Sequence, residues 1–176
     1  MDLSSPDIEG RLAAWKKHGA VAGFRHLLQS EPPEKMRDAT FRHGISKLEE
    51  YGYTFDILIY PKHLDAVIEF VDTFPNQPFV IDHLAKPHIR DRKLEPWKKQ
   101  MSKLAERPHV CCKLSGLVTE ANLQTWQPAD LRPYLDVALE SFGASRLMCG
   151  SDWPVCLLAG SYEKVLGVVE QYVEQL

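Results

Sequence analysis

Short apolar segments alternate with longer amphipathic segments along this chain. Five apolar runs of four to six residues begin near residues 21, 55, 79, 109 and 146. Each run is rich in β-branched or large apolar side chains and is bounded by Pro, Gly or Asn, which is typical of buried strands. Between the runs, apolar residues recur at helical spacing. We expect helices that begin at Ser5–Pro6, His63–Leu64, Pro96, Ala129–Asp130 and near Tyr162.

The alternation predicts an α/β fold with a parallel sheet. An open doubly wound sheet and a (β/α)8 barrel both satisfy it, but the chain lacks the glycine-rich phosphate loops that often mark the first. Polar residues instead follow the apolar runs, as barrel active sites require. A closed barrel takes about 250 residues and this chain has 176. Five strand–helix units in 176 residues cannot close a barrel, so either the sheet is open or the chain is a piece of something longer; in both cases we expect a single domain over residues 1–176.

The composition fits an ordinary globular protein and excludes two classes of partner. Hydrophobic residues make up 44% of the chain and charged residues 26%, with a net charge of −3. This balance argues against nucleic acid, whose phosphates bind clustered Lys and Arg. No apolar run approaches the about 20 residues of a membrane span, and the N-terminus does not read as a secretory signal. We expect a cytoplasmic protein that binds neither nucleic acid nor membrane.

The four cysteines predict reduced, mostly buried thiols. Cys111 and Cys112 are adjacent, which is poor geometry for an ordinary disulfide, and Cys149 and Cys156 lack the spacing of a zinc site. Nothing in the sequence around these cysteines indicates a thiol nucleophile.

Two residues stand out as candidates for catalysis or metal binding. His83 follows the third apolar run together with Asp82, and Asp152 follows the fifth run within a Gly-Ser-Asp-Trp-Pro loop. An imidazole can bind a divalent metal or polarise a carbonyl, and a carboxylate can bind a metal or accept a proton from water. A buried structural histidine and a turn-forming aspartate are the alternatives. Placement at the ends of two parallel strands favours one shared site.

Other polar residues fall at the same ends of the predicted strands. Arg25 and His26 follow the first run, and an arginine there can clamp a carboxylate or a carbonyl oxygen. Lys113 lies within an apolar strand, where an unpaired charge is costly, so we expect it to have a partner, either a carboxylate or a substrate. Tyr60 supplies a phenol to the barrel mouth or packs as an ordinary aromatic residue.

The chain resembles the amidohydrolase-2 family of the amidohydrolase superfamily, within it the lactonases that act on L-fucono- and L-rhamnono-lactones. The resemblance runs in collinear order from Val21 through Tyr162. It is carried by segments that are specific only together: Gly23–His26, Phe55–Leu58, Val80–Pro87, Cys112–Leu117 and Leu147–Val155.

The resemblance implies a (β/α)8 barrel that opens a lactone ring with water, as a step in carbohydrate metabolism. Of that barrel the chain would hold about five of eight strand–helix units, so the expected α/β fold is a partial TIM barrel. It implies Asp152 as general base, His83 as a second catalytic residue, and both as ligands of a divalent metal, zinc or manganese, where one is used. Arg25 and His26 fall at substrate-contact positions of the family, and we expect the substrate also to contact Tyr60, Lys113 and Trp153.

One departure from the family pattern changes what we expect of the chain. The family begins with a His-x-His pair on its first strand, and these 176 residues contain none. The sequence thus predicts that the first strands and the C-terminal helix of the barrel are missing. The alternative to a lactonase is then a truncated, non-catalytic product that acts by association with another chain. An open sheet edge would favour such association, including formation of a homo-oligomer.

Overall fold

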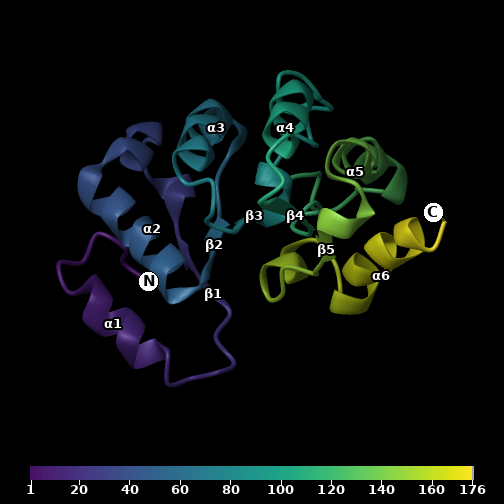
Figure 1. Cartoon of the computed structure of the whole chain (residues 1–176). Helices are drawn as coiled ribbons and strands as arrows, with labels where there is room; N and C mark the ends of the chain where they lie inside the picture. The colour runs from purple at the N-terminus through teal and green to yellow at the C-terminus, as the bar shows by residue number, and fades with distance from the viewer. Residues whose placement is uncertain (176) are drawn as a thin grey trace.

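The computed structural model describes residues 1–175 and contains one parallel sheet with helices packed along it (Figure 1). The strands follow one another in space as they do in sequence, so each crossover places the next strand at the growing edge. The strands are β1 (Gly23–His26), β2 (Thr54–Ile57), β3 (Phe79–Ile81), β4 (Val110–Leu114) and β5 (Leu147–Cys149). All five predicted strands are therefore confirmed, and the sheet is a partial TIM-barrel fold.

Over residues 1–175, one α-helix precedes the first strand, one lies in each of the four crossovers and one follows the last strand, and together they form an arc along the sheet (Figure 1). They are α1 (Ile8–Trp15), α2 (Ala39–Tyr51), α3 (Leu64–Thr73), α4 (Trp97–Ala105), α5 (Pro128–Phe142) and α6 (Tyr162–Val173). The predicted start of the first helix at Ser5–Pro6 is wrong, because α1 begins at Ile8 with Asp7 as its N-cap.

Helix α2 is absent from the elements that the sequence predicted. Its signals are nevertheless ordinary: Asp38 caps the first turn by accepting a hydrogen bond from the Phe41 amide, and Gly52 ends the helix in a left-handed conformation. Phe41, Ile45 and Leu48 form its buried face at helical spacing.

The core lies between the sheet and the helices, and aromatic rings mark its centre. Phe55 of β2 and Phe79 of β3 are register partners, and their ring centroids lie 6.3 Å apart. Phe41 of α2 and Phe70 of α3 complete the cluster, and all four side chains are buried. Each buried Phe stabilises the fold by about 1.5–3 kcal/mol. This cluster fixes which face of the sheet points toward the helices.

The cysteines follow the prediction in part. All four are free, and Cys112 and Cys156 are buried, but Cys111 is only half-buried and Cys149 is exposed on the edge strand β5. Within residues 1–175, no helix is both long enough and apolar enough to cross a membrane.

Candidate active site

Strand alternation places two predicted residues, Arg25 and Lys113, on the face of the sheet opposite the helices, together with Asp56. Phe24 and Phe55 point into the helix layer, so their neighbours Arg25 and Asp56, which are register partners, point the other way. Lys113 lies on the same face, two residues beyond Cys111, whose partner is Val80. The open face of the sheet thus carries charged side chains near the carboxyl ends of β1, β2 and β4.

These charges form a single ion-pair network. Lys113 Nζ contacts Asp56 Oδ2 and lies 2.8 Å from Asp82 Oδ1. Arg25 Nη1 donates to Asp82 Oδ2 at 3.1 Å. Burial lowers the pKa of Lys113, but hydrogen bonds and charges from Asp56 and Asp82 outweigh it, so the net pKa shift is upward. The expectation that Lys113 has a partner is confirmed, and the partners are two carboxylates.

His83 and Asp152 lie together, at the carboxyl ends of β3 and β5. His83 Nε2 is 3.3 Å from Asp152 Oδ1, and its Nδ1 is 2.8 Å from Ser115 Oγ. Burial lowers the pKa of His83 more than the charges of Asp152 and Asp82 raise it, which favours neutral imidazole. The ring therefore lies between the Ser115 hydroxyl on its Nδ1 side and the Asp152 carboxylate on its Nε2 side.

An unusual backbone turn aims the His83 ring. The four residues His83–Lys86 all have φ between 50° and 55°, a left-handed conformation that costs about 1–2 kcal/mol per L-residue. Trp97 Nε1 donates to the Leu84 carbonyl at 2.8 Å and anchors the turn from α4. Gly116, with φ of 62°, passes so close that a Cβ there would lie 2.7 Å from His83 Cγ. Strain of this kind gathers at functional sites.

The same turn brings Tyr60 next to this cluster. Lys86 Nζ lies 5.3 Å from the centroid of the Tyr60 ring and 3.6 Å from Glu120 Oε1. Burial raises the pKa of Glu120, and the nearby Lys86 charge opposes that shift. Tyr60 therefore borders the site, because its ring packs against the Lys86 ammonium group.

Two predicted substrate contacts lie apart from the others. His26 points to the opposite face from Arg25, with its ring centroid 5.3 Å from that of Phe41 and its Nε2 3.8 Å from Glu31 Oε1. Trp153 is 64% exposed. Among residues 1–175, neither side chain has a hydrogen bond or ion pair with His83 or Asp152, so their roles stay predictions.

Sequence reasoning gave no role to Asp56, Asp82, Glu120 or Ser115. Asp56 had a usable signal, since it is a charged residue inside the apolar run Phe55–Tyr60. Such a residue needs a partner for the same reason as Lys113. The pairing of the two required the fold, because 57 residues separate them.

The described residues do not complete a metal site by themselves. His83 Nε2 and Asp152 Oδ1 are two donors, and a catalytic zinc takes three protein ligands. Over residues 1–175, no three side chains of the His, Cys, Asp and Glu types come together in a way that could hold a metal ion. His83 and Asp152 therefore supply only part of a metal site.

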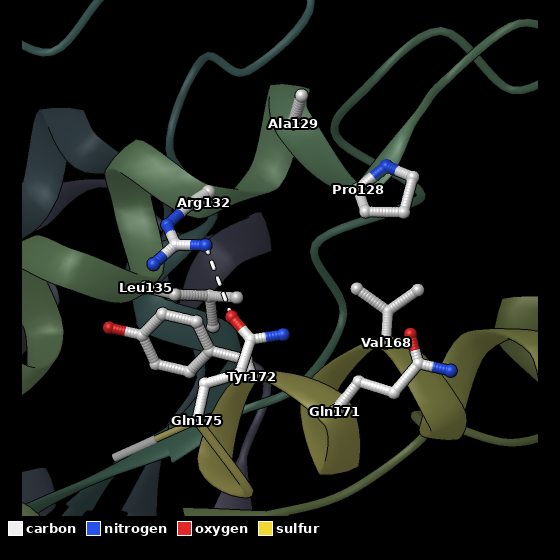
Figure 2. A pocket seen from close by; sticks show the side chains of 8 residues that line it. All are labelled: Pro128, Ala129, Arg132, Leu135, Val168, Gln171, Tyr172 and Gln175. Carbon is white, nitrogen blue, oxygen red and sulfur yellow. Dashed lines mark hydrogen bonds between the residues drawn. The ribbon is translucent and has the colours of Figure 1, made fainter.

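A separate cavity of about 220 Å³ lies between α5 and α6 (Figure 2). Arg132 and Gln175 join across it by a hydrogen bond of 3.2 Å, and Leu135, Val168 and Tyr172 supply apolar surface. None of the predicted site residues lines this cavity, so the candidate site is the cluster around His83 and Asp152.

The family follows from a match that covers almost the whole chain. Residues 1–174 match the model of the family described as Amidohydrolase. The chain belongs to this amidohydrolase family. The resemblance and the partial-barrel fold predicted from the sequence are both confirmed.

Individual relatives of this amidohydrolase chain agree with that assignment. The L-fucono-1,5-lactonase of Burkholderia multivorans is 41% identical over 98% of this chain and 62% of its own length. The L-rhamnono-gamma-lactonase of Scheffersomyces stipitis is 27% identical over 90% of this chain and 54% of its own length. A crystal structure of a Burkholderia multivorans amidohydrolase with bound zinc superposes with a TM-score of 0.93, at 41% identity, over 99% of this chain and 64% of that one. The chain thus spans less than two thirds of the length of these relatives.

Proposed function

We propose that this amidohydrolase chain is the main catalytic part of a hydrolase that opens a sugar-acid lactone with water. The observation that carries the proposal is the Asp152 carboxylate, held 3.3 Å from a neutral His83 at the carboxyl ends of parallel strands. The lactonase relatives support the substrate class. The proposal treats residues 1–176 as a single domain, and it includes the cytoplasmic location predicted from the sequence.

Asp152 acts as the general base in this proposal. Asp152 Oδ1 faces His83 Nε2 at 3.3 Å, and Oδ2 accepts a proton from water. The water oxygen bonds to the lactone carbonyl carbon, and the carbonyl becomes an oxyanion. When the ring C–O bond breaks, the proton on Asp152 passes to the leaving alkoxide, and the product is a hydroxy acid. A positioned acid–base group of this kind contributes about 10²- to 10⁴-fold in rate.

Arg25 stabilises the oxyanion. Its side chain is 46% exposed, and only one of its nitrogens is committed to Asp82, so further N–H groups remain to donate to the oxyanion. Preorganised donors aimed at developing charge are worth about 3–4 kcal/mol each. We propose substrate contacts for Tyr60, Lys113, His26 and Trp153 as well. The first two border the site, and the latter two rest on the family resemblance alone.

If the protein uses a divalent metal, zinc or manganese, we propose His83 and Asp152 as its ligands. Their two donor atoms would need a third ligand from outside the described cluster. When bound, such an ion would polarise a carbonyl or lower the pKa of water.

The proposal is tested by offering a panel of neutral aldonolactones to the purified protein. Ring opening releases one proton per turnover, so a weakly buffered indicator assay follows it directly. We expect acid release above the spontaneous rate. A panel that stays at the spontaneous rate, both with and without added zinc or manganese, would contradict the proposed function.

A second role in association with another chain is favoured by a separate observation. Trp153, Leu157 and Leu158, which follow the edge strand β5, are 64%, 54% and 68% exposed. Exposed apolar side chains this close together mark association surfaces. We propose a second copy of this chain as the partner.

A further inference from the structure

The candidate site contains more carboxyl groups than cations, and this balance bears on substrate charge. Arg25, Lys113 and Lys86 are its cationic side chains. The carboxyl groups around them are Asp56, Asp82, Glu120 and Asp152. Ion pairs join Arg25, Lys113, Asp56 and Asp82 into one group. Asp82 directly precedes His83, whose Nε2 lies 3.3 Å from Asp152 Oδ1.

Each cation already has a carboxylate partner within the site. Lys113 contacts Asp56 and lies 2.8 Å from Asp82, and Arg25 lies 3.1 Å from the other oxygen of Asp82. The Asp82 side chain is only 1% exposed, so water screens its charge weakly. A substrate carboxylate entering this site would therefore meet cations whose charge is already neutralised.

We propose that Asp56 and Asp82 are specificity-determining residues that admit neutral hydroxylated lactones and reject lactones that carry a carboxylate. This inference rests on the proposed function, and it adds the charge of the substrate and the residues that select it. A neutral lactone can accept hydrogen bonds from the remaining N–H groups of Arg25 and Lys113 without disturbing either ion pair. An anionic lactone would need one of those pairs to open, or would be repelled by Asp82 and Glu120.

Asp56→Asn tests the inference, because it leaves Arg25, Lys113 and Asp82 with one net positive charge while keeping the shape of the side chain. L-Galactono-γ-lactone and galactaro-γ-lactone are suitable substrates, since a hydroxymethyl group in the first is a carboxylate in the second. We expect the wild type to open the neutral lactone at least about tenfold more efficiently. In Asp56→Asn the preference should shift by about tenfold toward the anionic lactone.

Asp72→Asn is the matched control. Asp72, in the last turn of α3, forms a similar carboxylate ion pair to Arg107 at 2.8 Å, away from the candidate site. The substitution changes the net charge of the protein by the same amount as Asp56→Asn. We expect it to leave the preference between the two lactones unchanged. An equal shift in both variants would overturn the inference, because a general charge effect would then explain it.

Binding of galactarate, a stable dianion, separates this inference from the proposed function. If the wild type opens neither lactone, the proposed function fails, and calorimetric titration with galactarate still tests the charge selection. We expect galactarate to bind Asp56→Asn about tenfold more tightly than wild type or Asp72→Asn. Equal affinity in the three proteins, or no binding to Asp56→Asn, would overturn the inference. Should Asp56→Asn not fold, Glu120→Gln, which releases Lys86, must give the same gain.

Discussion

Ser115, Gly116 and Asp152 together determine how the His83 ring is presented. The Ser115 hydroxyl lies 2.8 Å from Nδ1 on one side of the ring, and Nε2 faces Asp152 on the other. Gly116 leaves room for the ring because it has no Cβ, and its φ of 62° suits glycine. The position of the His83 ring beside Asp152, the proposed base, therefore depends on Ser115 and Gly116, which carry no charge.

Gly116→Ala should displace the His83 ring. The new Cβ would lie 2.7 Å from His83 Cγ in addition to straining the backbone, so we expect a loss of about 2–4 kcal/mol in unfolding free energy. Gly52→Ala is the control, because Gly52 has φ of 69° but no atom closer than 4.0 Å to its Cβ position. Urea denaturation of both variants provides the measurement. Equal losses would show that the contact with His83 contributes nothing.

At the scale of elements, the apolar runs predicted the strands well because strands that pack against a helix layer carry apolar side chains. β3 is buried along its whole length, and a continuous apolar run is the pattern of such a strand. Helix α2 was harder to predict, since its segment carries many polar residues and its buried face rests on Phe41, Ile45 and Leu48. The sequence could predict that Lys113 has a partner, but it could not identify Asp56 and Asp82 as the partners. Strand order decides which carboxylates lie beside Lys113.

Loss of the Asp38 cap should destabilise α2 and the aromatic cluster that it covers. Asp38 Oδ1 accepts a hydrogen bond of 2.8 Å from the Phe41 amide, and removal of such a cap lowers stability. For a protein of this size we expect Asp38→Ala to lower the melting temperature by about 2–4 °C. Asp7→Ala is the control, because Asp7 precedes α1 without a side-chain cap bond. A melting temperature that falls equally in both variants would contradict the role of the cap.

At the scale of the whole molecule, β1 and β5 are the two edges of the sheet. Within residues 1–175, β1 pairs with β2 alone and β5 with β4 alone. Met148 on β5 is 39% exposed and Leu158 beyond it is 68% exposed. Edge strands with nearby apolar surface favour pairing with another chain.

We therefore expect the protein to self-associate in a concentration-dependent way. Sedimentation velocity between micromolar and hundred-micromolar protein should show the monomer giving way to larger species. Met148→Lys places a charge on the β5 edge and should weaken association by about tenfold or more. Lys103→Met, on the exposed surface of α4, alters charge away from the edges and should leave association unchanged. A protein that stays monomeric over this range would contradict the proposed homo-oligomer.

The central claim is that Asp152 removes a proton from water during lactone opening. The most direct test is the rate of acid release from a neutral aldonolactone by wild type and Asp152→Asn at equal concentration, with circular dichroism to confirm that both are folded. The proposed mechanism predicts a loss of about 10²-fold or more in kcat, because Asn keeps the shape but cannot accept the proton. A folded Asp152→Asn variant with wild-type kcat would contradict it.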